Sequence, residues 1–141
     1  MSPVQEETLA EFKEWIVESK IAQIELYDDY DCLRFCRARK FKMDDIKIMF
    51  TNYLKFREDD GVDTIIEDFH FHEADIIAKL YPCGYHKVDK NGWSLYIERM
   101  GTVDVKKILE ETTVERFTKH HIQSYELLMK LIFPALSEIK G

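Results

Sequence analysis

The sequence predicts a mixed α/β fold, in which a helical N-terminal part precedes a β-hairpin and further helices. Three observations carry this prediction. Apolar residues recur at helical spacing through the first half of the chain. Residues 84–99 then change to the aromatic and β-branched side chains of strands, on both sides of an Asn-Gly pair. Helical spacing returns after residue 103.

Three helices are predicted in the first sixty residues. The first has one apolar face, made by Leu9, Phe12, Trp15 and Ile16. A second is expected from Asp28 to about Lys40, because acidic side chains stabilise a helix N-terminus. A third is expected from Asp44 to Gly61, since glycine readily ends a helix. Short helical turns should follow between residues 62 and 80.

The hairpin is predicted around Asn91-Gly92, a pair typical of a two-residue loop with positive φ at both positions. A four-residue loop from Asp89 to Gly92 is the alternative. The two-residue loop places Tyr85 diagonal to Tyr96, and the four-residue loop places them directly opposite. Either loop puts both phenols on one face of the hairpin.

Helices are predicted again at residues 103–111 and 113–138, with Thr112 and Glu115 at the spacing of a capping box. Residues 127–133 are apolar on all sides, as in a helix buried on several sides. A hairpin alone is marginal in water, and no further strands are apparent in the sequence. We therefore expect these residues to be the N-terminal part of a larger domain.

Composition excludes several classes of function. The net charge of −7 argues against binding of nucleic acid by bulk charge. Three cysteines make no disulfide framework and suggest reduced thiols inside a cell. The sequence has no signal peptide pattern, nucleophile elbow, phosphate loop or zinc-protease motif. We expect no enzyme activity and no cofactor.

Cysteine and histidine show no ordered metal-ligand spacing. Cys32 and Cys36 share a helix face, and we interpret them as small buried thiols rather than as half of a metal site.

Five cations gather within nine residues, at Arg34, Arg37, Arg39, Lys40 and Lys42. Arginine and lysine at this density suit phosphate recognition. The alternative is a solvated helix face whose charges pair with nearby aspartates.

The tyrosines indicate a second candidate site. Tyr85 and Tyr96 share a face, and Tyr125 on the last helix could join them. Their rings suit methylenes or a choline cation, and their hydroxyls suit a phosphate. The alternative is a packed core in which the tyrosines bond to the backbone.

Several segments together resemble one known family. Residues 31–41 read DCLRFCRARKF and resemble the LLRFLRARKF segment of CRAL-TRIO proteins. The resemblance continues through residues 60–70, 77–82 and 85–92. The order and spacing are similar to those of yeast-type phosphatidylinositol/phosphatidylcholine transfer proteins.

The resemblance implies a helical CRAL-TRIO N-terminal domain at residues 1–73. Residues 74–141 would then be the start of an incomplete, truncated lipid-binding domain, without the family's gate helix and most of its pocket wall. The implied function is binding of phosphatidylinositol or phosphatidylcholine and exchange of these lipids between membranes. It includes transient contact with a membrane surface. The implied location is cytoplasmic, at the periphery of the Golgi or other internal membranes.

The resemblance also implies roles for five residues. Tyr85, Tyr96 and Tyr125 match tyrosines that approach the phosphatidylcholine headgroup. Arg39 and Lys40 match a pair beside the phosphatidylinositol headgroup.

Some positions depart from the family pattern. Trp93-Ser94 stands where Arg-Pro is typical, and Arg99 replaces an acidic residue. A different class of function therefore stays open: a non-transfer helical interaction module, or a fragment without function. The apolar segment 127–133 would then contact a partner.

Overall fold

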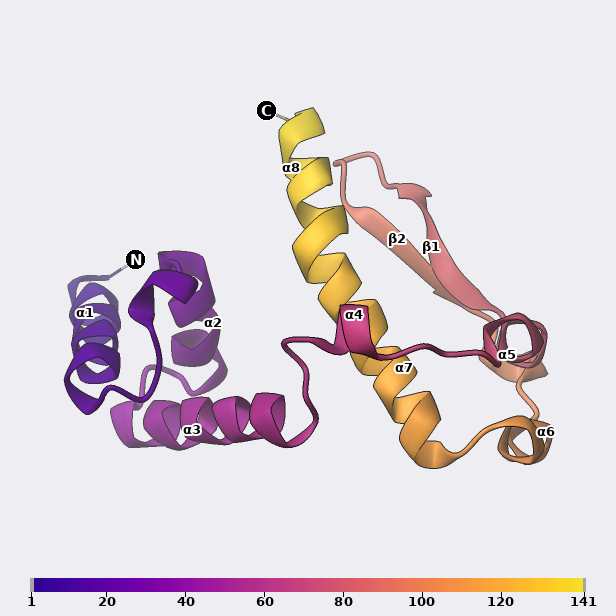
Figure 1. The fold of residues 1–141 in the computed structure, drawn as a ribbon. Helices are drawn as coiled ribbons and strands as arrows, with labels where there is room; N and C mark the ends of the chain where they lie inside the picture. The colour runs from indigo at the N-terminus through magenta and orange to yellow at the C-terminus, as the bar shows by residue number, and fades with distance from the viewer. Residues whose placement is uncertain (1, 141) are drawn as a thin grey trace. The chain divides into compact units, whose positions relative to one another are not determined.

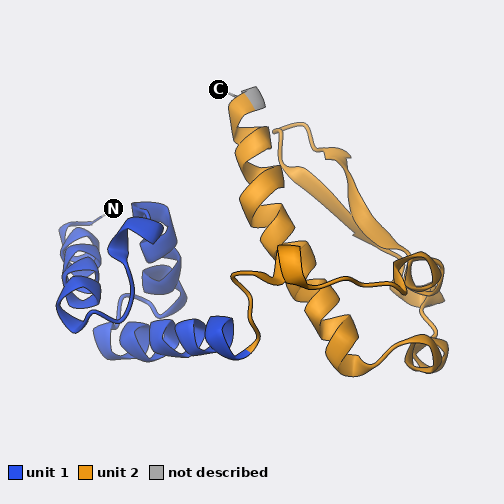
Figure 2. Ribbon diagram, viewed as in Figure 1, with its two compact units in different colours: residues 1–59 blue, residues 60–141 orange. Residues whose placement is uncertain are grey.

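A computed structural model describes residues 2–140 of the chain. The chain divides into two compact units, residues 1–59 and residues 60–141 (Figure 2). Each unit is described by itself below.

The first unit consists of helices, as predicted. They are α1 (Pro3–Ser19), the short 3-10 helix η1 (Ile24–Leu26), α2 (Asp29–Ala38) and α3 (Met43–Asp59) (Figure 1). Local sequence sets where they begin. Ser2 and Gln5 form a capping box at α1, and Asp28 accepts a hydrogen bond from the Asp31 N–H at α2.

Phe50 lies at the centre of the first core. It is fully buried, and its ring centroid lies 5.3 Å from that of Phe12, 5.1 Å from Phe35 and 5.2 Å from Tyr27. Complete burial of one such ring stabilises the fold by about 1.5–3 kcal/mol. The buried set that packs together is Leu9, Phe12, Ile16, Cys32, Leu33, Phe35, Cys36, Ile46 and Phe50.

The second unit has several short helices, a hairpin and one long helical segment. Its elements are α4 (Ile65–Asp68), α5 (Ala74–Leu80), β1 (Cys83–Val88), β2 (Ser94–Glu98), the 3-10 helix η2 (Met100–Thr102), α6 (Val105–Glu111), α7 (Val114–Leu127), η3 (Leu128–Ile132) and α8 (Phe133–Lys140). The η3 segment is a π-helical stretch that joins α7 to α8 without a break in the helix. Figure 1 shows the hairpin beside this long helix. The predicted mixed α/β class is confirmed.

Residues 60–73 fold with the second unit. Gln123 of α7 donates from Nε2 to the carbonyl oxygens of Ile65 at 3.1 Å and Phe69 at 2.8 Å. Arg116 donates to the carbonyl oxygen of His70 at 3.1 Å. The boundary between the compact units therefore lies at residue 60 of the sequence, whereas the family domain boundary at residue 73 stays a prediction.

The hairpin forms neither predicted loop, because Val88 pairs with Ser94 and the five residues 89–93 connect the strands. Gly92 N–H donates to the Asp89 carbonyl at 3.0 Å, and Asp89 N–H donates to the Trp93 carbonyl at 2.8 Å. Gly92 has a φ of 83°, whereas Asn91 has no positive φ. Both the predicted two-residue loop and the four-residue alternative are therefore wrong. The Asp89 carboxylate explains the difference, because it accepts hydrogen bonds from the N–H groups of Asn91 and Trp93 and closes the longer turn.

A bulge adjusts the strand register. Tyr85 lies opposite Tyr96, but Val88 lies opposite Ser94, so the register shifts between Tyr85 and Val88. Lys87 has a φ of 56° within that interval. The bulge shifts the register by one residue and so places the two tyrosines opposite one another, the pairing that the four-residue alternative predicted from a different loop.

The predicted cap of the long helix is wrong by one residue. Thr113, not Thr112, accepts a hydrogen bond from the Arg116 N–H, at 3.2 Å. Thr112 is buried, and its hydroxyl lies 3.4 Å from Glu73 Oε1. Sequence spacing alone could not separate two adjacent threonines that both suit a cap.

Candidate functional site

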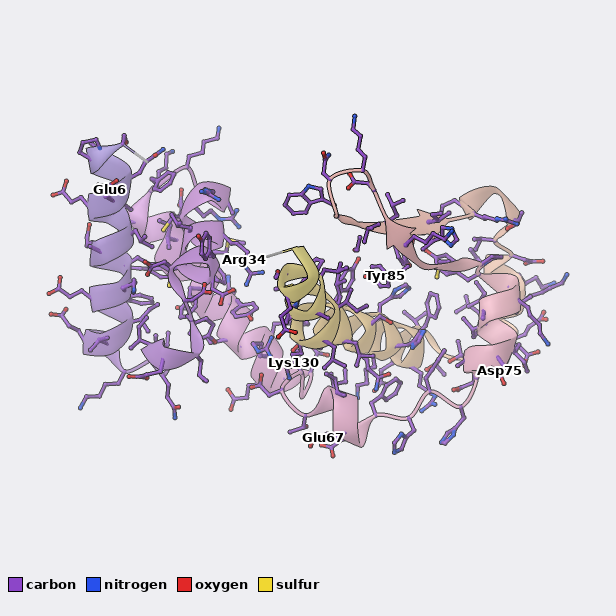
Figure 3. The ribbon with its side chains drawn as sticks, turned by 90° about the horizontal axis from the view of Figure 1, so that it is seen from above. Glu6, Arg34, Glu67, Asp75, Tyr85 and Lys130 are labelled. Carbon is purple, nitrogen blue, oxygen red and sulfur yellow. The ribbon has the colours of Figure 1, made fainter. Side chains whose placement is uncertain are left out.

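The tyrosine face of the hairpin is formed as predicted. The ring centroids of Tyr85 and Tyr96 lie 5.0 Å apart at an interplanar angle of 50°. Figure 3 shows Tyr85 between the hairpin and the long helix. Because the two rings lie opposite on neighbouring strands, their positions follow directly from the register of the hairpin.

The tyrosine pair borders a cavity of about 180 Å³ within the second unit. Side chains of α5, the two strands and α7 line it: Ala74, Ile77, Ala78, Tyr81, Cys83, Tyr85, Tyr96, Phe117, His120, His121 and Ser124, together with Gly84. Both phenols remain partly exposed, Tyr85 at 38% and Tyr96 at 43%. The pair therefore does not fill a closed core, which favours the binding interpretation over simple packing.

Hydrogen bonding, partial burial and neighbouring groups raise the pKa of three phenols in this region. The Tyr81 hydroxyl donates to Glu98 Oε1 at 2.8 Å, and this hydrogen bond raises the pKa of Tyr81 to about 12. Partial desolvation, then Tyr125 and Cys83, raise the pKa of Tyr85. Partial desolvation and the Cys83 thiol also raise the pKa of Tyr96. All three phenols therefore stay protonated near neutral pH; the Tyr81 hydroxyl donates to Glu98, and Tyr85 and Tyr96 are the phenols that can donate to a ligand oxygen.

His120 brings a polar group that the sequence analysis did not single out. Its Nδ1 atom is buried and has no hydrogen-bond partner in the part of the chain that the structure describes. The Phe71 ring stacks on the imidazole, with centroids 4.3 Å apart. Burial, and then the neighbouring His121, lower the pKa of His120, so the imidazole is neutral near pH 7.

Helical spacing along α7 could have found this wall of the cavity. Phe117, His120, His121 and Ser124 recur at three and four residues, which places them on one side of a helix. Their mixed polarity hid the pattern, because hydrophobic periodicity alone does not recognise histidine and serine.

Tyr125 is less enclosed than the other two predicted tyrosines. It lies in α7, directly after the cavity residue Ser124, and its side chain is 63% exposed. Tyr125 is not among the residues that line the cavity. The structure therefore brings Tyr85 and Tyr96 into one cavity and leaves Tyr125 exposed nearby on α7.

The predicted basic pair belongs to the first unit. Arg39 and Lys40 are exposed in the connection between α2 and α3. Lys40 and Phe41 have φ angles of 52° and 59°, in the left-handed region that residues other than glycine rarely adopt. The Phe41 N–H donates to the Cys36 carbonyl at 2.8 Å, which ties this connection to the end of α2.

Among the other members of the basic cluster, Arg34 forms an ion pair with an aspartate. Arg34 donates to Asp31 at 2.8 Å, an exposed pair one helical turn apart. Arg37 and Lys42 are exposed. The aspartate alternative therefore applies at Arg34.

Cys32 and Cys36 are buried free thiols, as predicted. Burial raises the pKa of Cys32 to about 11 and also raises that of Cys36. Thiols that ionise this reluctantly are poor nucleophiles and poor metal ligands at neutral pH. Within residues 2–140, no group of three His, Cys, Asp or Glu side chains could hold a metal ion.

None of the described helices has both the length and the apolar sequence that crossing a bilayer requires.

Comparisons with known proteins agree on one group. Residues 8–52 match the family described as CRAL/TRIO, N-terminal domain. The chain is 50% identical over 105 residues to the phosphatidylinositol/phosphatidylcholine transfer protein SFH7 of Arabidopsis thaliana, an alignment that covers 74% of this chain and 19% of that protein. It is 44% identical over 137 residues to the SEC14 cytosolic factor of Kluyveromyces lactis, covering 97% of this chain and 45% of that protein.

A third relative, the transfer protein SFH4 of Arabidopsis thaliana, is 42% identical over 127 residues, which are 90% of this chain and 21% of that protein. The chain therefore spans from about a fifth to just under half the length of these relatives.

Proposed function

The chain is related to the CRAL/TRIO phospholipid-transfer proteins, as its sequence predicted, and on this premise we propose that it binds phosphatidylinositol or phosphatidylcholine for transfer between membranes. The observation that carries the proposal is the cavity beside Tyr85 and Tyr96, on the face that the family resemblance assigns to the lipid headgroup.

The tyrosine cavity supplies contacts for phosphatidylcholine. A choline cation is attracted to the faces of aromatic rings, and protonated phenols donate to phosphate oxygens. Tyr85 and Tyr96 offer both kinds of contact 5.0 Å apart, and Tyr125 is the third expected contact. Binding needs no covalent chemistry, and the proposed role is therefore not enzymatic.

Phosphatidylinositol is assigned to Arg39 and Lys40. Both side chains are exposed in a connection tied to the buried end of α2, so their charges are available to an anionic headgroup.

Transfer requires more protein surface than binding. Burying each acyl methylene is favourable by about 0.8 kcal/mol, and only an enclosed apolar pocket provides that burial away from a membrane. The long helix exposes Met129, Leu131 and Phe133 instead of enclosing a chain. We propose that further protein surface, in addition to residues 1–141, covers this side during exchange.

The proposed location is the cytoplasm, with transient contact at the surface of the Golgi or other internal membranes. The relative from Kluyveromyces lactis is named a cytosolic factor, which supports a cytoplasmic site of action.

Binding can be tested by native mass spectrometry of the chain after incubation with phosphatidylcholine or phosphatidylinositol vesicles. Tyr85→Ala with Tyr96→Ala should reduce the phosphatidylcholine adduct roughly tenfold, because cation–π contacts are worth about 1–2 kcal/mol in such sites. Tyr30→Ala, an exposed tyrosine of α2, is the matched control. An undiminished adduct in the double variant contradicts the assignment.

The inositol assignment has its own control in the same basic cluster. Arg39→Ala with Lys40→Ala should weaken the phosphatidylinositol adduct and leave the phosphatidylcholine adduct intact. Arg37→Ala with Lys42→Ala removes the same charge nearby. Equal loss in both double variants would reduce the assignment to general electrostatic attraction.

Transfer can be tested in a chimera, in which residues 1–141 replace the matching segment of the Kluyveromyces lactis relative. We expect the chimera to move labelled lipid between vesicles and residues 1–141 alone to bind without transfer. Transfer by residues 1–141 alone would show that no further surface is needed.

A second candidate is an interaction module, favoured by the 60% exposure of Leu131 on the long helix. Light scattering that detects a stable dimer, in a chain that carries no lipid adduct, would support this candidate.

A further inference from the structure

A second hollow lies at the tip of the hairpin, away from the tyrosine cavity. It has a volume of about 370 Å³ and is lined by Gly92, Trp93, Ser94, Phe133, Leu136 and Ser137. Figure 1 shows the hairpin loop beside α8, the two elements that supply these residues. For comparison, an engineered cavity of roughly 150 Å³ holds benzene.

The two hollows lie on the same side of the hairpin. Ser94 lines the tip hollow and Tyr96 lines the tyrosine cavity, and residues two apart on a strand point to the same face. On the helical side, Ser124 borders the first hollow and Leu136 the second. These positions are about 18 Å apart along a helix that rises 1.5 Å per residue.

The two hollows differ in the polarity of the side chains that line them. The tyrosine cavity carries phenols and imidazoles. The tip hollow is lined by an indole, a phenyl ring, a leucine and the small hydroxyl side chains of Ser94 and Ser137, and the Ser137 hydroxyl donates to the Phe133 carbonyl at 2.9 Å rather than to the hollow. Polarity therefore decreases from the base of the hairpin to its tip, as it does along a phospholipid from headgroup to acyl chain.

We propose that the tip hollow holds an acyl chain of the phospholipid whose headgroup lies in the tyrosine cavity. This inference rests on the proposed function. Trp93 is the principal contact: it is 67% exposed, and an alkyl chain would cover its indole.

Tryptophan fluorescence reports this placement directly. The chain has two tryptophans, Trp15 in the first unit and Trp93 at the hairpin tip. The probe is phosphatidylcholine brominated along its acyl chains, because bromine quenches an indole that it contacts. In Trp15→Phe, the brominated lipid should roughly halve the fluorescence relative to the unbrominated lipid. The proposed placement brings heavy atoms of the acyl chain within about 4.5 Å of the Trp93 indole.

The matched control is Trp93→Phe, in which Trp15 alone emits and no quenching is expected. Trp15 packs against the first core, so Trp15→Phe could impair folding. In that event, the difference between the unaltered chain and Trp93→Phe isolates the same signal.

Native mass spectrometry of the same samples distinguishes failure of the acyl-chain placement from failure of the proposed phospholipid binding. A lipid adduct without quenching of Trp93 overturns the acyl placement and leaves the proposed function standing. Absence of any phospholipid adduct overturns both.

Filling the hollow provides a second test. Ser137→Phe places a ring in the tip hollow, whereas Ala135→Phe places one at an exposed α8 position outside it. We expect Ser137→Phe to lower the adduct ratio of long-chain to dihexanoyl phosphatidylcholine roughly tenfold, because displaced methylenes lose their burial. Equal ratios in the two variants would contradict the inference.

Discussion

The two compact units use their apolar side chains in different ways. In the first, three helices converge on Phe50 and bury nine residues as one cluster. In the second, buried apolar residues are fewer and separated along the chain: Val62, Ile65, Ile77, Ile108 and Leu128. Many large apolar side chains of the second unit are exposed instead, among them Trp93, Tyr125, Leu131 and Phe133.

This difference separates stability from binding. A cluster closed by its own helices derives its stability from contacts that a ligand cannot replace. An exposed apolar face gains by being covered, whether by a lipid or by further protein. We therefore expect substitutions in the first unit to act on folding, and substitutions on the tyrosine side of the second unit to act on binding.

The largest effect is expected from Phe50→Ala. Removing this ring from the centre of the first core should cost about 3–5 kcal/mol of unfolding free energy, from lost burial and the cavity left behind. Urea unfolding followed by the fluorescence of Trp15, in a Trp93→Phe background, measures it. Ile48→Ala, at a 62% exposed position of the same helix, is the control. Similar urea midpoints for Phe50→Ala and Ile48→Ala would show that Phe50 is not packed in a tightly filled core.

The same comparison in the second unit should give a smaller difference. Ile77 is 3% exposed and its neighbour Ile76 is 45% exposed, both in α5. We expect Ile77→Ala to cost about 2 kcal/mol, the low end for such substitutions, because an open unit can relax around the loss. Hydrogen exchange of the α7 amides measures it. A cost equal to that of Phe50→Ala would remove the contrast between the units.

Helix caps should act alike in both units, because their effect is local. Asp28 caps α2 and Thr113 caps α7, each through a side-chain oxygen that accepts a backbone N–H. Each change to alanine should cost about 1 kcal/mol, measured by exchange of the first-turn amides. Thr64→Ala is the control, because Thr64 precedes α4 without a capping bond from its side chain. A cost confined to Asp28→Ala would indicate that α7 is not independently stable.

The smallest expected effect is a pH dependence confined to the second unit. Arg116 binds both carboxylate oxygens of Glu73 at 2.7 Å, and these hydrogen bonds lower the pKa of Glu73 from 4.5 to about 2. A lowered folded-state pKa means that the stabilisation is complete above pH 4.5 and is lost as pH falls toward 2.

Glu73→Gln should therefore flatten the acid limb of thermal unfolding of the second unit between these values. Glu115→Gln, which alters an exposed pair with Lys119 in α7, should leave the limb in place. An unchanged limb in Glu73→Gln would mean that other carboxylates cause the acid sensitivity.

Local patterns predicted the helices of the first unit well. The apolar face of α1, the acidic start of α2 and the glycine after α3 each act within a few residues, and all three helices are confirmed. The cavity wall on α7 was missed because it depends on segments far apart in sequence. Phe71 stacks on His120 across 49 positions, and no local pattern records such a contact.

Sequence by itself determined the fold class and the order of elements, because helical and strand periods are properties of neighbouring residues. The structure alone decided that residues 89–93 connect the strands and that a bulge then sets Tyr85 opposite Tyr96. It also decided that the tyrosines border an open cavity and that a separate apolar hollow lies at Trp93. Hollows arise where packed elements fail to fill space, and that depends on how distant segments meet.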